Sequence, residues 1–248
     1  MLYAAGPALV YLLCGLLTAV AAVFFSRIRL VRVPLPRQPL TFESLFAGIR
    51  FIFHRQAVLG AVSLDLFAVL LGGATALLPI FAQDILLVGP FGLGMLRSAP
   101  AVGALLSAVW LARHPIQRRA GRILFAAIAL FGMATLVFAL STVFVVSMLA
   151  LAVTGAADMV SVVIRQSLVQ LETPDEMRGR VSAVNAIFIG ASNQLGEFES
   201  GVTAAWWGAV NSVVVGGLGT LVVVAVWMRR FPELAQREQL QRSPGESE

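Results

Sequence analysis

The chain alternates long apolar runs with short polar segments that carry most of its charged residues. A membrane-spanning helix needs about 20 mainly apolar residues, because each residue adds about 1.5 Å across a hydrocarbon core about 30 Å thick. Seven runs are long enough, so the pattern predicts an all-α polytopic membrane helix bundle with seven transmembrane helices. The expected spans are residues 2–25, 57–81, 92–111, 123–140, 143–163, 181–206 and 209–228.

Residues 27–56 interrupt this pattern after the first span. Pro34 and Pro36 break any helix that continues from it. The following stretch, TFESLFAGIRFIFHR, places its apolar residues on one helical face and its charged residues off that face. This predicts an amphipathic helix at the membrane surface. The predicted organisation is a span at 1–26, a cytoplasmic loop with a surface helix at 27–56, a six-helix bundle at 57–230 and a cytoplasmic tail without fixed structure at 231–248.

Two local signals refine the spans. Thr173, Pro174 and Glu176 follow the pattern of a helix N-cap, first helical position and capping-box acid, which predicts a helix start at this turn. Gly72-Gly73 and the Gly-Ala-Ala run at 155–157 permit close helix packing or a local bend. Close packing is the interpretation we favour for both.

The charge balance excludes a soluble domain and predicts an orientation. The chain is 58% hydrophobic and only 12% charged, whereas soluble domains are about 25% charged. All 18 basic residues are arginine and lie mostly between the apolar runs, so the net charge of +5 does not indicate nucleic-acid binding. Arginine favours cytoplasmic links. The links after the first, third, fifth and seventh spans carry arginine and the others do not, which predicts a multi-pass cell (inner) membrane protein with its N-terminus outside and its C-terminus in the cytoplasm.

Several kinds of chemistry have no support in the sequence. A retinal Schiff base needs a lysine, and the chain has none. Cys14 is the lone cysteine, and His54 and His114 lie far from any second ligand. There is no HExxH, GxSxG or P-loop motif. We therefore expect no metal, no cofactor and no enzymatic activity, while a seven-helix receptor-like protein stays open without a positive signal.

Two acids fall within predicted spans. Asp65 is the one charged residue between 57 and 81, and Asp158 lies in the fifth span. A carboxylate there costs about 2.5–3.5 kcal/mol on insertion scales, so such acids usually face the protein interior or a water-filled path. In the predicted orientation Asp65 lies roughly 12 Å, and Asp158 roughly 10 Å, from the cytoplasmic side. Both are candidates for proton coupling; the alternative is a structural acid hydrogen-bonded between helices.

Other polar residues in or near the spans are candidates for a substrate path. Arg165 and Gln166 are expected beside Asp158, just beyond the fifth span. Arg97 could neutralise Glu197 or Glu199 if the third and sixth spans touch, and its snorkelling to the outer interface is an equal alternative. The substrate-path candidates are Arg97, Arg165, Gln166, Asn185, Asn193, Gln194 and Glu197.

Residues from about 38 to 235 resemble the C-terminal six-helix half of major facilitator superfamily transporters, in particular the enterobactin-exporter-like branch. The resemblance rests on SLDLFAVLLGGATALLPIFA at 63–82, LRSAPAVGALL at 96–106, the long motif GAADMVSVVIRQSLVQLETPDEMRGRVSAVNAIFIGASNQLGEF at 155–198 and FPEL at 231–234. It implies that residues 2–25 are helix six of twelve. It also implies proton-driven export of small molecules, of drug or siderophore type, by alternating access.

The superfamily's cytoplasmic loop motif, Asp-Arg-x-Gly-Arg, has a counterpart in RRAGR at 118–122. Arg118 stands where the resemblance would place the acid, which puts a charge-locking role of this loop in doubt. The loop-motif residues carried over by the resemblance are Arg118, Arg119, Gly121, Arg122, Arg178, Gly179 and Arg180.

The first five helices of the usual twelve have no counterpart in the sequence. The substrate path of these transporters lies between two six-helix halves, so polar residues of this half should face the other. We expect the lipid bilayer, a small-molecule substrate and protons as partners, with a separate N-terminal half as an open option and no nucleic acid. The alternative is a non-transporting membrane subunit or truncated relic that retains only the fold.

Overall fold

The computed structural model describes residues 7–27, 42–116 and 118–237. The chain divides into two units, residues 1–40 and 41–248. In the first unit, helix α1 (Pro7–Arg27) covers most of the predicted first span. The prolines and most of the arginines predicted to follow this span lie outside the described residues, as does the end of the predicted tail.

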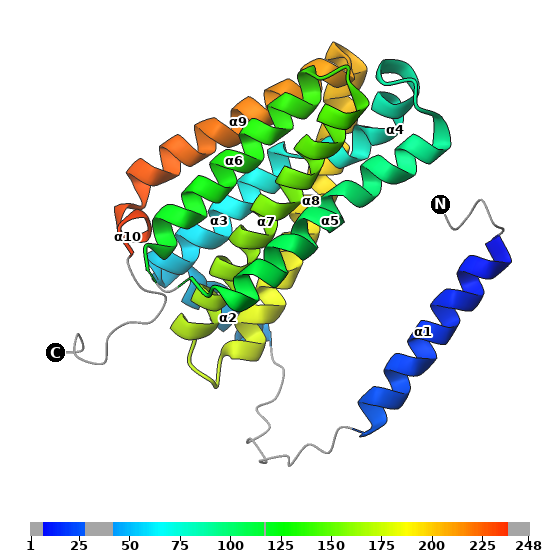
Figure 1. Ribbon diagram of the computed structural model, residues 1–248. Coiled ribbons are helices and arrows are strands. Elements are labelled where there is room, and N and C mark those ends of the chain that lie inside the picture. The colour runs from blue at the N-terminus through cyan, green and yellow to red at the C-terminus, as the bar shows by residue number, and fades with distance from the viewer. Residues whose placement is uncertain (1–6, 28–41, 117, 238–248) are drawn as a thin grey trace. The chain divides into compact units, whose positions relative to one another are not determined.

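The described part of the second unit consists of helices and short connections (Figure 1). Its elements are α2 (Phe42–His54), α3 (Gln56–Leu71), the 3₁₀ turn η2 (Ala74–Leu77), α4 (Leu78–Ile80), the π turn η3 (Phe81–Ile85), α5 (Gly89–Arg113), α6 (Ala120–Leu140), α7 (Phe144–Glu172), α8 (Arg178–Trp207), α9 (Ala209–Arg230) and α10 (Pro232–Ala235).

The prediction of an all-α polytopic bundle is confirmed, but the count of seven spans is not. Over the described residues, six helical stretches are long and apolar enough to cross a membrane: Ala8–Arg27, Gln56–Ile85, Gly89–Arg113, Ala120–Leu140, Phe144–Glu172 and Ala209–Arg230. The remaining predicted span corresponds to α8. This helix has 30 residues, so its length suffices, but its polar residues keep it out of the six.

The long helices of the second unit pack side by side. Helix α7 lies between α5 and α6, and α6 lies between α7 and α9 (Figure 1). Helix α3 contacts α8, α9 and α7. The α5–α7 crossing is close: a Cβ atom at Gly155 would collide with the carbonyl oxygen of Pro100. The small side chains predicted around residue 155 therefore permit the packing that we expected.

The second predicted span is not one continuous helix, contrary to expectation. Helix α3 ends at Leu71 with Gly72 as its C-cap, and the chain continues through the 3₁₀ turn, a short α-helical turn and the π turn to Ile85. Gly73 also lies so close to α8 that a Cβ atom there would meet the backbone of Gly196 and the hydroxyl of Ser200. The glycine pair thus provides both a bend and close packing, whereas we had favoured packing.

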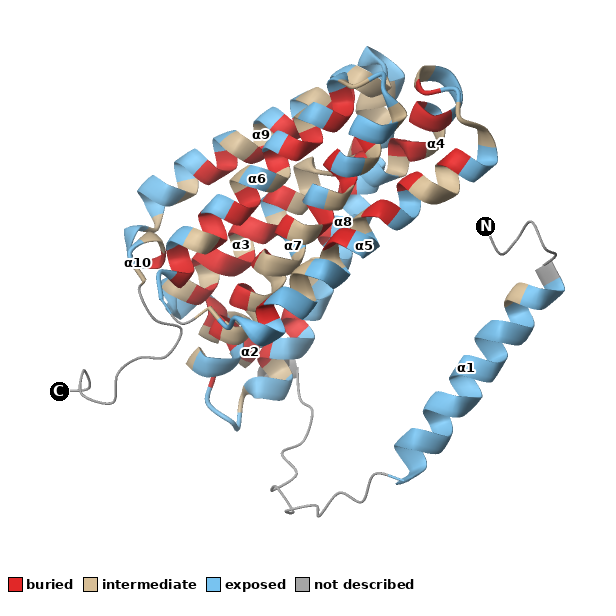
Figure 2. Ribbon diagram, viewed as in Figure 1, coloured by how far each residue is buried: buried red, intermediate tan, exposed pale blue. Residues whose placement is uncertain are grey.

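Two groups of buried side chains hold the second unit together (Figure 2). The first, which includes Leu124, Leu168 and Leu234, joins α2, α3, α6, α7, α8, α9 and α10. The second, which includes Phe81, Phe138 and Leu151, joins the broken part of the second span to α5, α6, α7 and α9. Many large apolar side chains on the outer faces are exposed, as expected of helices surrounded by lipid.

The start of the predicted sixth span and the segment after the predicted seventh span differ from expectation. Thr173 does not cap the following helix: its hydroxyl donates a hydrogen bond of 2.5 Å to the carbonyl of Val169, and α8 begins at Arg178. The tail was predicted to lack structure, yet α10 follows α9 directly and the side chain of Leu234 is fully buried. The local residue pattern could not show that other helices of the bundle bury this leucine.

The predicted amphipathic helix forms as α2, and protein covers part of its apolar face. It packs against α3 and α8. Ile52 is buried, while Phe46 and Phe53 are exposed. The exposed phenylalanines lie on the part of the helix that protein does not cover, and contact of this part with the membrane surface stays a prediction.

Candidate functional site

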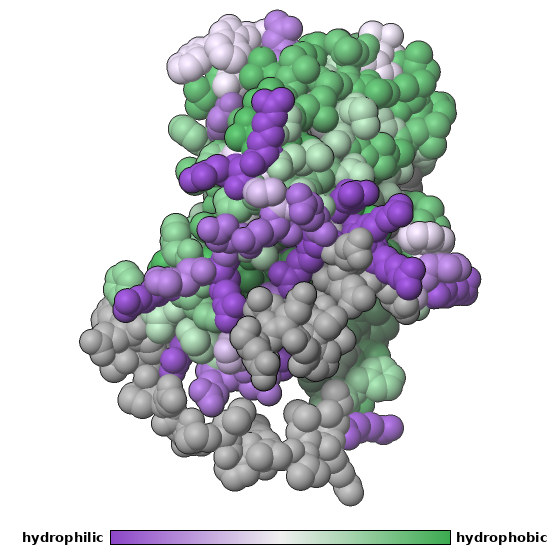
Figure 3. Space-filling model, turned by 90° about the vertical axis from the view of Figure 1, so that its left-hand side faces the viewer, coloured by the Kyte–Doolittle hydropathy of each residue, from purple (hydrophilic) through white to green (hydrophobic). Residues whose placement is uncertain are grey.

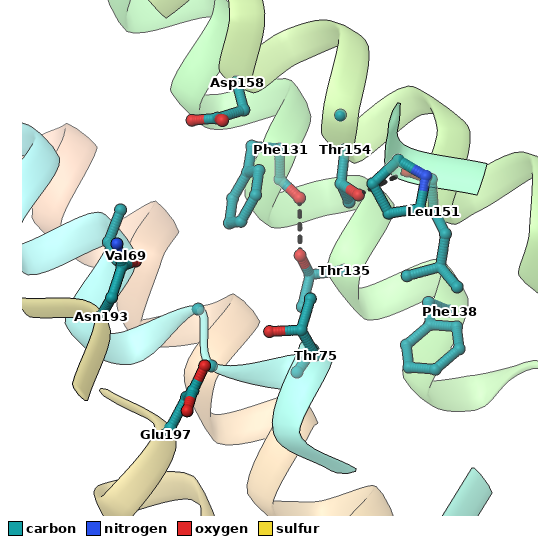
Figure 4. Close-up of a pocket in the computed structure, with 15 residues that line it drawn as sticks. Val69, Thr75, Phe131, Thr135, Phe138, Leu151, Thr154, Asp158, Asn193 and Glu197 are labelled. Carbon is teal, nitrogen blue, oxygen red and sulfur yellow. Dashed lines mark hydrogen bonds between the residues drawn. The ribbon is translucent and has the colours of Figure 1, made fainter. Parts of the chain in front are cut away.

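An open cavity of about 200 Å³ lies where α3, α5, α6, α7 and α8 come together (Figure 4). The break after α3 forms part of its wall, because Gly72, Gly73 and Thr75 line it. Phe131 and Phe138 of α6 supply apolar wall. The remaining lining residues are Val69, Ala74, Pro100, Thr135, Leu151, Thr154, Gly155, Asp158, Asn193 and Glu197.

The polar groups of the cavity fall into two classes. The hydroxyls of Thr135 and Thr154 donate to the carbonyls of Phe131 and Leu151, at 2.9 and 2.7 Å, within their own helices (Figure 4). Asp158 of α7 and Asn193 and Glu197 of α8 are exposed. Their side chains have no hydrogen-bond or ion-pair partner among the described residues. They are therefore available to water, to a ligand or to another segment of protein.

Asp65 is closed off from solvent by an ion pair. Its carboxylate contacts the guanidinium of Arg165, and the two residues are 6% and 3% exposed. Arg165 was expected beside Asp158 just beyond the fifth span, and this expectation is wrong. Helix α7 continues to Glu172, so Arg165 lies inside it and faces α3.

A second, small cavity of about 20 Å³ connects the two acids. Asp65 and Asp158 both line it, together with Ser161 and the ring of Phe131. Asp158, Phe131 and Val69 also line the larger cavity. The two acids that the sequence predicted at similar depth therefore lie close together, and Phe131 and Val69 line both cavities.

The opposite side of Asp65 is polar as well. Asn185 and Ser192 of α8 border it in a further crevice. Three polar groups nearby are buried without a hydrogen-bond partner among the described residues: the Oδ1 of Asn185, the Oγ of Ser161 and the Nε of Arg165. Such groups are costly unless water or a rearrangement satisfies them.

The other candidates lie away from the cavity. Arg97 is exposed on α5 and makes no ion pair with any described residue, so the proposed pairing with a glutamate is absent. Gln194 is exposed and Gln166 is partly buried.

Among the loop-motif residues, Arg118, Arg119 and Arg122 are exposed, Gly121 is buried, and Gly179 is exposed at the start of α8. Arg178 pairs with Asp175 at 2.6 Å, and the backbone of Arg180 lies against Gly48.

Sequence reasoning missed the threonines and the glycine break that line the cavity. The sequence did contain a sign that the helix continues past Arg165: Ile164, Leu168 and Val169 extend the buried stripe of α7 beyond the predicted end of the span. Within the described ranges, no group of three histidine, cysteine, aspartate or glutamate side chains is arranged to hold a metal ion.

Comparison with known proteins adds the family. Enterobactin exporter EntS of Salmonella typhimurium (strain LT2) is 24% identical over 226 residues, which cover 89% of this chain and 54% of the exporter. EntS of Escherichia coli O81 (strain ED1a) and that of Shigella boydii serotype 18 are each 26% identical over 231 residues, covering 86% of this chain and 54% of theirs. The chain thus spans about half the length of these relatives.

No solved structure gives a significant match. The family model described as "Transmembrane secretion effector", of the major facilitator superfamily, matches residues 1–246. Together with the apolar helices, this identifies a multi-pass membrane protein of a transporter family rather than an enzyme family. The chain belongs to the transmembrane secretion effector family of the major facilitator superfamily.

Proposed function

We propose that this chain forms the C-terminal half of a proton-coupled exporter of small molecules that works by alternating access. The observation that carries the proposal is the open cavity with the unpaired side chains of Asp158, Asn193 and Glu197. Lipid offers no hydrogen bonds to such groups, so this face of the helices needs water, substrate or protein over it. Transporter substrate sites lie between two repeats and often beside broken helices, as the break at Gly72 lies here.

The substrate class follows from the lining and from the relatives. Two carboxylates, one amide and two phenyl rings suit a small molecule that combines aromatic surface with hydrogen-bond donors. A catechol siderophore has both features. The relatives' names, enterobactin exporters, support a siderophore-type substrate.

The two acids have unequal roles in this proposal. Asp65 is paired with Arg165, whereas Asp158 faces the open cavity without a partner among the described residues. When the cavity closes and loses water, desolvation favours the protonated form of an unpaired carboxylate. Asp158 is thus the proton carrier, and the Asp65–Arg165 pair holds α3 against α7 until the transporter changes state.

The test uses the chain together with an N-terminal half from a relative, in cells that lack their own exporter. Asp158→Asn should abolish siderophore efflux driven by a pH gradient while membrane insertion is retained. Asp175→Asn, which removes an exposed acid outside the cavity, is the matched control and should export normally. Full efflux by the Asp158→Asn variant would refute the coupling role. Absence of efflux from the assembled wild type would favour a subunit that retains only the fold.

A further inference from the structure

A small polar cavity lies at the RRAGR segment, residues 118–122. Its volume is about 80 Å³, and it is lined by Arg119, Arg122, Ala235, Gln236 and Arg237. It lies between the start of α6 and the segment that follows α10. It shares no lining residue with the cavities around Asp65 and Asp158.

The cavity is held open by close contacts beneath it. The buried Leu234 lies directly under Gly121, where a Cβ atom would collide with the leucine carbonyl oxygen. The backbone N–H of Gly121 donates to the carbonyl of Arg237 at 3.2 Å. The Arg237 guanidinium pairs with Glu172 at the end of α7. These contacts fix the position of α10 and of Arg237 against the first turn of α6.

The charges around the cavity are not balanced by the described residues. Glu172 compensates Arg237, while no described carboxylate pairs with Arg119 or Arg122. The exposed guanidinium groups of Arg119 and Arg122 repel each other unless an anion lies between them. The first turn of α6 adds the positive end of its helix dipole at the same place. An arginine presents donors in a planar arrangement that matches phosphate oxygens.

The position of the cavity at the end of a long apolar helix indicates which class of anion it could bind. Helix α6 is long and apolar enough to cross a membrane, and it begins at Ala120, beside the cavity. The face that includes α10 shows hydrophilic side chains next to a largely hydrophobic surface (Figure 3). Lipid headgroups lie at such a boundary between hydrophobic and hydrophilic surface in a membrane protein, and basic pockets at this level bind anionic headgroups.

We propose that this cavity binds a phosphate group, with the guanidinium groups of Arg119 and Arg122 as its main ligands. The phosphate belongs to the headgroup of an anionic phospholipid or to a free phosphate in solution, because both present the same oxygens. Occupancy would tie the first turn of α6 to α10 and to the end of α7. The site is independent of the transport cavity.

The test is native mass spectrometry of the full chain purified in detergent with phosphatidylglycerol or phosphatidylcholine. The wild type should retain one phosphatidylglycerol in preference to phosphatidylcholine. The double variant Arg119→Gln/Arg122→Gln should weaken that binding by roughly 10-fold or more, the effect of losing charge-assisted hydrogen bonds. Arg229→Gln/Arg230→Gln is the matched control: it removes two exposed arginines at the end of α9 and should bind as the wild type does.

Inorganic phosphate distinguishes the two sources. Displacement of the lipid by millimolar phosphate would identify free phosphate as a competing ligand, while retention would identify the lipid headgroup; either result supports a phosphate site. Equal losses in the two double variants would reduce the effect to general surface charge and overturn the proposal. Unchanged binding in Arg119→Gln/Arg122→Gln, checked by size-exclusion chromatography to be folded, would also overturn it.

Discussion

Removal of Arg165 should be far more damaging than removal of Arg165 and Asp65 together. Both side chains are almost fully buried, at 4% and 9% exposure. The variant Arg165→Leu leaves a buried carboxylate without its counter-charge. Breaking a buried pair in this way costs about 3–5 kcal/mol, whereas replacing both members by apolar groups is often neutral. We therefore expect Arg165→Leu to be strongly destabilised and Asp65→Leu/Arg165→Met to lie within about 1–2 kcal/mol of the wild type.

The structure gives a reason why the double variant should recover. The Nε of Arg165 has no hydrogen-bond partner among the described residues, so desolvation of the guanidinium is incompletely compensated. The ion pair consequently adds little net stability over an apolar pair.

The assay is equilibrium unfolding in mixed dodecylmaltoside and SDS micelles, followed by circular dichroism. A matched control is the exposed pair of Arg178 and Asp175, whose side chains are 52% and 78% exposed. Exposed pairs contribute about 0–1 kcal/mol, so Arg178→Leu should unfold close to the wild type. A single variant Arg165→Leu as stable as the wild type, or a double variant no better than the single one, would refute the reasoning.

Two further predictions concern orientation and the C-terminal helix. In a Cys14→Ser background, cysteine at the exposed Pro115 should react with an impermeant thiol reagent from the cytoplasm only and cysteine at Leu87, which is 78% exposed, from outside only; the reverse labelling would invert the orientation. The variant Leu234→Ala should lower the free energy of unfolding by about 2–5 kcal/mol, because it empties a fully buried site; an effect below about 1 kcal/mol in the same micelle assay would show that α10 contributes little to the bundle.

The sequence predicted what depends on local pattern. Apolar runs of sufficient length became long helices, whereas the orientation inferred from the arginine-bearing links stays a prediction. The residue counts from the span ends also placed Asp65 and Asp158 at similar depth, and both now line one small cavity. The long helices and the proximity of the two acids could be predicted because helix length and rise are nearly constant.

The errors arose where tertiary contacts override local polarity. Arg165 was taken as the end of a span because an arginine is costly in lipid, but Asp65 on α3 compensates it and the helix continues. The pair Gly72-Gly73 is compatible with either packing or bending, and only the position of α8 shows that it serves both. Leu234 looked like part of a polar tail, and the surface that buries it comes from α3, α6 and α9.

Helix α7 links the closed ion pair to the open acid. Asp158, Ser161 and Arg165 follow one another at spacings of three and four residues, which places them on one face of the helix. Asp158 and Arg165 are therefore about 10 Å apart on a single rigid element. Coupling between two sites needs such an element with two arrangements that both sites bias. In the proposed transport cycle, a shift of α7 against α3 would alter the surroundings of Asp158 and the Asp65–Arg165 contact together. Protonation of Asp158 would therefore depend on whether the Asp65–Arg165 contact is formed.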